Sequence, residues 1–251
     1  MIDFHTHVLP GLDDGAQDVD TAKTMLQMQL DQGVDTVLLT SHYYGKKHSP
    51  SQFLEKRKEA FERLAPHIPQ GVSVRLGAEV HFTGINTPDY EELCRLVIEG
   101  TDYMLVELPF TTKWTNDLME RLSDFVYETG CTPIIAHVER YQEVLKNPAI
   151  VSELVNMGCL IQVNARAFSE KSEKNFAFAL LKHGLVHCIG SDAHDTEYRL
   201  PDVAAAKTAM EKAGYADAWN AIQTLMKRVL NNDRIVFQGG RPIKKFFGRY
   251  F

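Results

Sequence analysis

Two histidines two positions apart lie at the start of the chain, in the segment 1–7. Side chains two positions apart on an extended strand share a face, so the imidazoles of His5 and His7 can meet one ion. Carboxylates follow in the next loop at Asp13 and Asp14 and can reach back toward the pair. Imidazole nitrogens with nearby carboxylates are suited to a divalent ion such as Zn²⁺, Mn²⁺ or Fe²⁺.

The elements that must position these groups recur along the chain as a helical segment, a glycine and a short apolar run. Glycine is the usual residue just after a helix because it adopts the left-handed conformation without a Cβ clash. Short bounded apolar runs are typical of buried parallel strands. With a strand at Ile2–His5, the pattern predicts seven strands, the others following Gly33, Gly71, Gly100, Gly130, Gly158 and Gly184.

Alternating helices and parallel strands predict an α/β fold, a closed or nearly closed β/α barrel. The rival is an open doubly wound sheet, but no G-x-G-x-x-G loop follows the first strand. We expect one domain over residues 1–251, with 239–251 as a C-terminal tail whose role the sequence does not define. Helices are predicted around Phe53–Leu64 and Leu118–Val126 and from Ala218 to Val229. Asn147 is predicted to cap another helix, with Pro148 at its first position, and Leu200-Pro201 to open one more.

Active sites of such barrels lie at the C-terminal ends of the strands, and six of the seven predicted strands end in His, Asp or Glu. Any one histidine there is more often a capping or core residue, as we interpret His48, His67, His81, His183 and His187. Six coincident strand ends instead predict a metal centre. Only strand six, ending Gln162-Val163-Asn164, offers no strong ligand. The strand-end candidates are His5, His7, His42, Glu79, Glu107, His137, Asp192 and His194.

Composition excludes several other classes of protein. The 251 residues are 44% hydrophobic and carry a net charge of −6, which argues against a general nucleic-acid or membrane binder because both partners are anionic. No apolar run approaches a membrane span and no secretory signal is evident, so we expect a cytoplasmic protein. The four cysteines form no C-x-x-C pair and no cysteine-nucleophile phosphatase loop.

The order H-x-H, His, Glu, Glu, His, D-x-H resembles the polymerase-and-histidinol-phosphatase (PHP) superfamily of metal-dependent phosphoesterases. The opening segment 1–15, Thr40-Ser41-His42, the segment 136–141 (Ala-His-Val-Glu-Arg-Tyr) and the segment 191–194 followed by Arg199 look like one subgroup. That subgroup is the bacterial manganese-dependent protein-tyrosine phosphatases encoded with capsule and exopolysaccharide genes. The resemblance covers roughly residues 1–235, and 239–251 matches no motif of the family.

The resemblance implies a distorted (β/α)₇ barrel that holds three divalent ions, Mn²⁺ or alternatively Fe or Zn, with Glu79 bridging two of them. Arg140 and Arg199 match positions that hold the phosphate, although a salt bridge with Glu139 is the alternative for Arg140. Either Asp13 or Asp14 could be the carboxylate ligand. The implied ligands are His5, His7, Asp14, His42, Glu79, Glu107, His137, Asp192 and His194.

The function implied is hydrolysis of phosphotyrosine in proteins, by resemblance in the tail of a bacterial tyrosine autokinase that controls capsule or exopolysaccharide synthesis. Aromatic residues near the strand ends could stack on a phenyl ring or belong to the core: Tyr43, Tyr44, Phe110, Trp114 and Tyr141.

Three alternatives share parts of this pattern. Histidinol-phosphate phosphatase would use the same ligands, but the loops Tyr43–Ser51 and Thr111–Asn116 are too short for large lids and so favour a protein substrate. A polymerase-associated module would need a longer chain and a degenerate site. An amidohydrolase usually has a lysine and a histidine where Glu107 and Asn164 stand.

Overall fold

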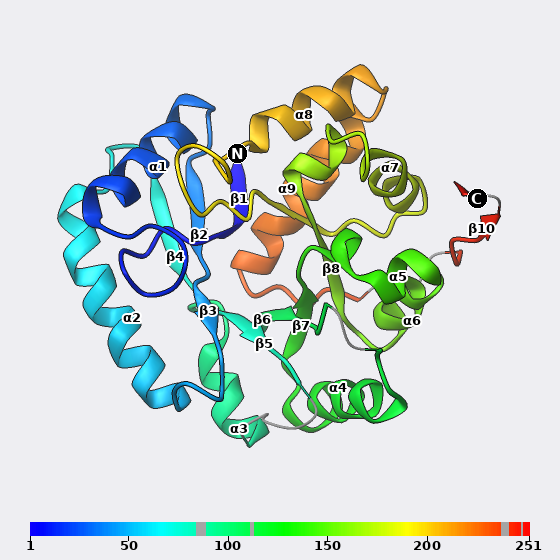
Figure 1. Ribbon diagram of the computed structural model, residues 1–251, viewed down its shortest axis with the longest axis horizontal. Helices are drawn as coiled ribbons and strands as arrows, with labels where there is room; N and C mark the ends of the chain where they lie inside the picture. Colours follow the sequence, from blue (N-terminus) through cyan, green and yellow to red (C-terminus); the bar gives the residue numbers. More distant parts are fainter. Residues whose placement is uncertain (84–88, 111–112, 237–240, 247) are drawn as a thin grey trace.

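Parallel strands form the centre of the fold, with helices arranged around them in Figure 1. The computed structural model describes residues 1–83, 89–110, 113–236, 241–246 and 248–251. All seven predicted strands are present, and the second and third are each interrupted. In chain order they are β1 (Ile2–Thr6), β2 (Thr36–Leu39) and β3 (His42–Tyr43), β4 (Ser73–Leu76) and β5 (Glu79–His81), β6 (Tyr103–Glu107), β7 (Thr132–Ile135), β8 (Leu160–Asn164) and β9 (Cys188–Gly190).

The strands curl into a nearly closed barrel made of two sheets. One has the order β1-β2-β4 and the other β3-β5-β6-β7-β8-β9, with every neighbouring pair parallel. A bridge between Thr6 and Ala193 joins the first strand to the segment after the last. The predicted barrel is therefore confirmed, and its distortion comes from the interruptions that split the second and third strands between the two sheets.

Helices cover the outside of the barrel with amphipathic faces. In α2, Ser49 and Gln52 form a capping box and Phe53, Ala60 and Leu64 are buried, as the apolar periodicity predicts. The helices are α1 (Val19–Asp31), α2 (Pro50–Leu64), α3 (Tyr90–Leu93), α4 (Asn116–Thr129), α5 (Gln142–Lys146), α6 (Ile150–Asn156), α7 (Lys174–Lys182), α8 (Val203–Lys212) and α9 (Ala216–Leu230), with 3₁₀ turns η1 (Ala65–His67), η2 (Cys94–Leu96), η3 (Val138–Arg140) and η4 (Ala165–Phe168).

Two predicted helix starts are wrong by a few residues. Asn147 ends α5 instead of capping the next helix, and α6 begins only at Ile150. Pro201 precedes α8, whose N-cap is Asp202. In both places a polar residue next to proline is compatible with a helix end or a helix start, so the local sequence alone does not distinguish them.

Part of the predicted C-terminal tail forms a small antiparallel hairpin, β10 (Lys245–Phe246) and β11 (Arg249–Tyr250). Its Tyr250 ring lies 4.9 Å from that of Phe176 in α7, and Ile243 is buried. Of the tail at 239–251, residues 239, 240 and 247 lie outside the described residues. No helix in the described ranges is long and apolar enough to cross a bilayer.

Candidate metal centre

The first and last strands bring two histidines and an aspartate together. The Asp192 amide donates to the His5 carbonyl (2.8 Å), and the His7 amide donates to the Ala193 carbonyl (2.9 Å). A Cβ at Gly190 would lie 2.5 Å from the His5 Cβ, so only glycine allows this close approach. The backbone therefore fixes the relative positions of these side chains.

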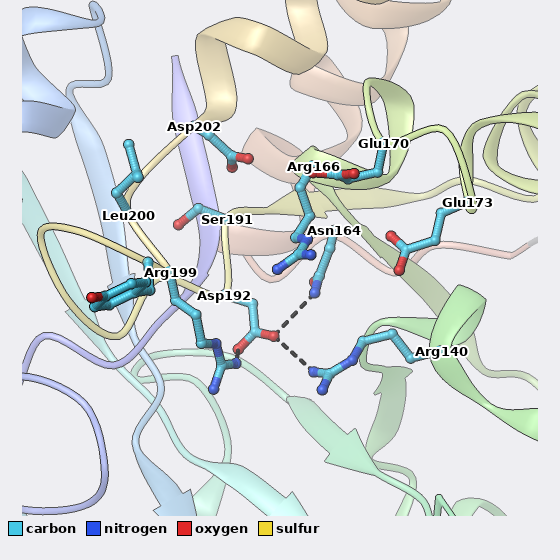
Figure 2. Close-up of a pocket in the computed structure, with 11 residues that line it drawn as sticks. Arg140, Asn164, Arg166, Glu170, Glu173, Ser191, Asp192, Arg199, Leu200 and Asp202 are labelled. Carbon is cyan, nitrogen blue, oxygen red and sulfur yellow. Dashed lines mark hydrogen bonds and ion pairs between the residues drawn. The ribbon is translucent and has the colours of Figure 1, made fainter.

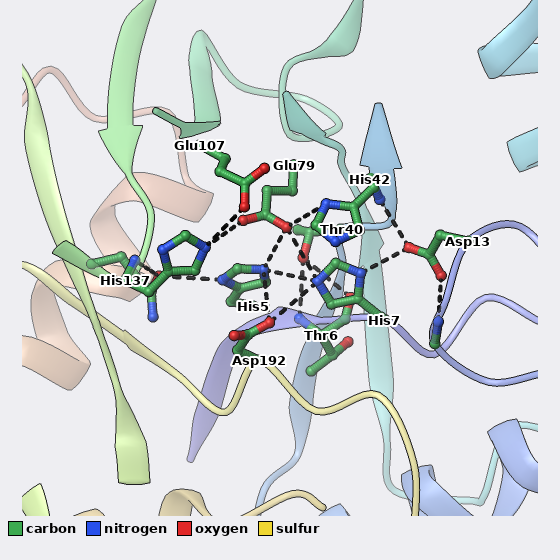
Figure 3. Close-up of polar contacts among 12 residues, drawn as sticks. His5, Thr6, His7, Asp13, Thr40, His42, Glu79, Glu107, His137 and Asp192 are labelled. Carbon is green, nitrogen blue, oxygen red and sulfur yellow. Dashed lines mark hydrogen bonds and ion pairs between the residues drawn. The ribbon is translucent and has the colours of Figure 1, made fainter. Parts of the chain in front are cut away.

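The side-chain nitrogens of this first group converge. His5 Nε2 lies 3.0 Å from His7 Nε2, and Asp192 Oδ1 is 3.6 Å and 3.4 Å from these two nitrogens. Figure 3 shows the two imidazoles and the carboxylate turned toward one another. Two imidazole nitrogens and an oxygen around one point are a donor set for a divalent cation.

Glu79, at the start of β5, joins this first group to a second. Its Oε2 is 3.3 Å from both His5 Nε2 and His7 Nε2 and 2.9 Å from His42 Nδ1. Its Oε1 is 2.7 Å from His137 Nε2. A fully buried carboxylate that faces four imidazoles can serve two ions at once.

Glu107 completes the second group from the end of β6. Glu107, Glu79 and His42 each direct a ligand atom into one small volume, and Glu107 Oε1 is 3.7 Å from His137 Nε2. The strands β5 and β6 are hydrogen-bonded neighbours, so their carboxyl ends meet at the same edge.

A third group contains Asp14 and not the adjacent Asp13. Asp14 Oδ1 lies 3.5 Å from both His42 Nε2 and His194 Nε2, and together with His7 these residues form a possible ion site. Asp13 instead accepts hydrogen bonds from His7 Nδ1 (2.8 Å) and the His42 amide (2.8 Å). Asp13 therefore orients a histidine, and Asp14 carries the available oxygen.

The chemistry of these groups fits divalent ions. Several buried polar atoms at the rim make no well-oriented hydrogen bond within the described part of the chain, although the first two lie 2.9 Å apart: Glu79 Oε2, His42 Nδ1, His137 Nδ1 and His194 Nε2. Buried polar atoms are almost always satisfied, so such a concentration marks positions where a cation would complete the contacts. All nine predicted ligands lie at this rim, and each has a nitrogen or oxygen in or beside one of the three groups.

Electrostatics at the rim reflects the same crowding. Burial alone would lower the pKa of His7, but Asp13, Asp192 and Glu79 together raise it well above its ordinary value. Burial would raise the pKa of Glu79, yet the surrounding histidines hold it well below its usual range. Without ions, the raised pKa values of His5 and His7 favour protons that balance the carboxylates, and cations can replace those protons.

Backbone strain coincides with two of the candidate ligands. His137 has φ 32° and Asp192 has φ 56°, in the left-handed region that non-glycine residues rarely adopt. Strained residues of this kind cluster at functional sites because surrounding contacts hold them in place.

Arg140 and Arg199 lie on either side of Asp192 (Figure 2). Arg140 Nη1 is 3.0 Å from Asp192 Oδ2, and Arg199 Nη2 is 2.8 Å from Asp192 Oδ1. The alternative of an Arg140–Glu139 salt bridge is not what the structure shows, because Glu139 is buried and its Oε1 accepts from the Asn164 amide. Both arginines are about one third exposed, so they can exchange partners at the rim.

Sequence reasoning missed several residues that hold the ligands in place. Gln162 Oε1 lies 3.2 Å from His5 Nδ1 and accepts from the His137 amide (2.7 Å). Asn164 Nδ2 donates to Asp192 Oδ2 (3.0 Å). The sequence signal that could have revealed them is the placement of Gln162 and Asn164 two positions apart in an otherwise apolar strand, where both side chains face the same side.

One histidine that we interpreted from the sequence as a capping or core residue also lies at the site. His81 Nδ1 is 2.9 Å from Glu107 Oε2, on the oxygen turned away from His137, so it can orient that carboxylate. His187, by contrast, is buried and accepts from the Ile161 amide, as a core histidine would.

The predicted aromatic residues divide into core and rim. Tyr43, Trp114 and Tyr141 are buried and pack within the protein. Phe110 stacks on His137 with centroids 5.1 Å apart, and Tyr44 lies 5.1 Å from the His42 ring. Only these two remain partly exposed beside the metal groups. Thr111 and Thr112, in one of the short loops, lie outside the described residues.

A parallel β/α barrel with His, Asp and Glu clustered at the carboxyl ends of its strands defines the class of metal-dependent hydrolases. Residues 1–231 match the family model described as "Capsular polysaccharide synthesis, CpsB/CapC". The chain belongs to this CpsB/CapC family.

Individual relatives agree with this assignment. The chain is 29% identical to the tyrosine-protein phosphatase YwqE of Bacillus subtilis, over 99% of both chains. It is 30% identical to the tyrosine-protein phosphatase CpsB of Streptococcus pneumoniae, over 85% of this chain and 93% of that one. A crystal structure from a study of YwqE and CpsB, described as metal-dependent tyrosine phosphatases, superposes with a TM-score of 0.83 and 26% identity, covering 98% of this chain and 100% of that one.

Proposed function

We propose that the nine rim side chains hold three divalent ions, Mn²⁺ in the first instance, for the hydrolysis of phosphotyrosine in proteins. The chain is a metal-dependent tyrosine phosphatase of capsular polysaccharide synthesis, like the relatives it matches. The observation that carries the three-ion proposal is the set of three His/Asp/Glu groups that share His7 and His42, with Glu79 of one group 3.3 Å from His5 and His7 of another.

Each ion would have its own set of side chains. His5, His7 and Asp192 would hold the first. Glu79 and Glu107 would hold the second together with His137, whose Nε2 is 2.7 Å from Glu79 Oε1, so that Glu79 faces both ions. His42, which belongs to two of the three groups, would then be a ligand of the third ion. The third would lie between Asp14, His42 and His194. Nine ligands over three ions leave coordination positions for substrate, unlike a closed structural site.

Charge at the loaded rim favours a phosphate monoester. Three divalent ions would bring six positive charges against four carboxylates among the ligands, so the rim would attract a dianion. When bound, the ions supply Lewis acidity toward the phosphoryl oxygens and activate the attacking water.

The two arginines would position the phosphate. In the structure each guanidinium bonds Asp192, and a phosphate at the rim offers oxygens of the same geometry as a carboxylate. Arg140 also stacks over Phe110, 4.8 Å from the ring centroid, which limits its rotation. Phe110 and Tyr44 are placed to contact the phenyl ring of the substrate.

For the protein substrate, we propose a phosphotyrosine-bearing tail of a bacterial tyrosine kinase that controls capsule or exopolysaccharide synthesis. The support is the family description, which ties the chain to capsular polysaccharide synthesis. A cytoplasmic location remains a prediction of the sequence.

A phosphatase assay with and without Mn²⁺ tests the proposal. Phosphotyrosyl peptide should be hydrolysed in a reaction that chelator stops and thiol alkylation spares, because no cysteine lies at the rim. Phosphoserine peptide should be a poor substrate, since its leaving group is poorer and its reach shorter. Histidinol phosphate is the comparison substrate: much more efficient turnover of it than of the peptide would contradict the assignment.

A further inference from the structure

A cavity of about 540 Å³ opens directly beside Asp192 and extends beyond the metal groups. Arg140 and Arg199 line it, together with Arg166, Glu170 and Glu173, which follow β8. Figure 2 shows this space bounded on one side by Arg166. The cavity is thus continuous with the phosphate position but larger than a phosphate requires.

The strand without a metal ligand supplies the third arginine of this cavity. Arg166 lies two residues beyond Asn164, on the turn η4, whose other residues Ala165, Ala167 and Phe168 are buried. The carbonyl of Arg166 accepts from the amides of Ser169 and Glu170. The backbone at Arg166 is therefore held in place, while the residue as a whole is exposed.

The Arg166 guanidinium is available for a ligand. Arg140 and Arg199 each bond Asp192, whereas the side chain of Arg166 has no hydrogen bond or ion pair among the residues that the structure describes. Arg166 lowers the pKa of Asp202, but burial, Asp3 and Asp192 together raise that pKa to about 7. The donors of the Arg166 guanidinium therefore remain open to a ligand that enters the cavity.

Glu170 and Glu173 also line the cavity. Both are at least partly exposed, so water and salt screen their charges. These two carboxylates therefore weaken the attraction between Arg166 and an anionic ligand without cancelling it.

We propose that Arg166 binds an acidic side chain next to the phosphotyrosine and so acts as a specificity-determining residue of this phosphatase. The inference rests on the proposed function, because it assumes that the phosphotyrosine occupies the metal rim. With the phosphate at Asp192, the adjoining residues of an extended peptide pass over this cavity. A carboxylate there can form the charge-assisted hydrogen bonds that a guanidinium fork favours.

Three phosphotyrosyl peptides that differ only beside the phosphotyrosine, carrying Asp, Ala or Lys on both sides, test the inference. Wild-type protein should prefer Asp over Ala by about fivefold in kcat/KM, the value of one partly exposed ion pair. Arg166→Ala should bring that ratio close to one, Arg166→Glu should reverse it in favour of Lys, and Arg166→Lys should keep part of it. Glu173→Gln should enlarge it.

Arg75→Ala is the matched control, since Arg75 is an exposed arginine on β4 outside the cavity, and the Asp preference should persist in it. Melting curves establish that the Arg166 variants are folded. An Asp preference that persists in Arg166→Ala overturns the inference. The inference is also overturned if Arg166→Ala lowers kcat/KM equally for all three peptides and for p-nitrophenyl phosphate, because Arg166 would then be a phosphate contact.

Fluorescence anisotropy with labelled, non-hydrolysable phosphonate versions of the peptides gives the same ratios without turnover. If Arg166→Ala loses the preference for binding the Asp peptide, the subsite is supported even where the rates of hydrolysis rank the substrates differently. Failure of the phosphatase assignment is thereby seen separately from failure of the subsite.

Discussion

The carboxyl-terminal rim of the barrel is built from buried ionisable side chains, whereas the layer between its strands and helices is built from apolar ones. At the rim, buried carboxylates and imidazoles crowd together, and several of their nitrogen and oxygen atoms make no well-oriented hydrogen bond among the described residues. In the layer below, residues such as Leu122 of α4 and Ile134 of β7 are fully buried among other apolar groups. Burial there stabilises the fold, whereas burial at the rim costs free energy until ions or protons balance the charges.

The difference teaches that activity and stability can be changed separately in this chain. A rim substitution should mainly affect catalysis, and a substitution in the apolar layer should mainly affect folding.

The largest expected effect comes from removing a rim ligand. His7→Ala or Glu79→Ala should lower Mn²⁺-dependent phosphatase activity by at least about 10³-fold, because each side chain faces more than one ion position. Circular dichroism should show a folded protein in both cases. Substantial Mn²⁺-dependent turnover in both variants would contradict the ligand assignment.

Leu122→Ala is the matched change in the apolar layer. Its cavity should cost about 3 kcal/mol of unfolding free energy, measured by urea denaturation. Activity per folded molecule should stay close to that of the wild type. If this variant lost activity as completely as the rim variants, the separation of the two regions would fail.

The two arginines that we propose position the phosphate should give the next largest effect. Arg199→Ala or Arg140→Ala should lower kcat/KM for phosphotyrosyl peptide by about 10²-fold, since each removes a charge-assisted contact to the transferred group. Lysine should restore part of the activity because it keeps the charge but not the fork. Unchanged steady-state kinetics in both alanine variants would show that the arginines only pair with Asp192.

Much of this organisation could be predicted from the sequence because it depends on local patterns. The strands follow from glycine and short apolar runs, and the rim follows from chemistry placed at strand ends. The interruptions between Leu39 and His42 and between Leu76 and Glu79 could not be predicted, since they arise from pairing with two different sheets.

Contacts between segments that are distant in the chain could not be predicted from the sequence either. That Asp13 binds His7 and leaves Asp14 available depends on the path of one loop. From the sequence, Gln162 and Asn164 belong to a strand that offers no strong metal ligand. In the structure their side chains contact His5 and Asp192 and hold them in place.

A smaller effect distinguishes a core histidine from those at the rim. Burial lowers the pKa of His187 to about 4, so below its unfolded pKa of about 6.5 the unfolded chain binds a proton that the folded chain does not. Stability is therefore lost as the pH falls from about 6.5 toward 4, by up to about 3 kcal/mol. His187→Asn keeps an acceptor for the Ile161 amide and should flatten this dependence in urea titrations; equal slopes in both proteins would refute the assignment.

The C-terminal hairpin should show the smallest effect. Tyr250 packs on Phe176, while Phe246 and Phe251 are largely exposed, so deleting residues 246–251 should lower the melting temperature by a few degrees (about 1 kcal/mol). Substituting Phe251 alone should change it less. Unchanged stability together with weaker association with a partner would instead indicate a docking role for the basic and aromatic residues.

Metal content is the most direct test of the central claim that the rim is a centre for several ions. Wild-type protein loaded with Mn²⁺ and dialysed should retain about three ions per chain by plasma mass spectrometry, from nine ligands at about three per ion. Glu79→Ala, which loses the carboxylate between two groups, should retain about one while remaining folded. Retention of no ions by the wild type, or an unchanged content in Glu79→Ala, would contradict the account.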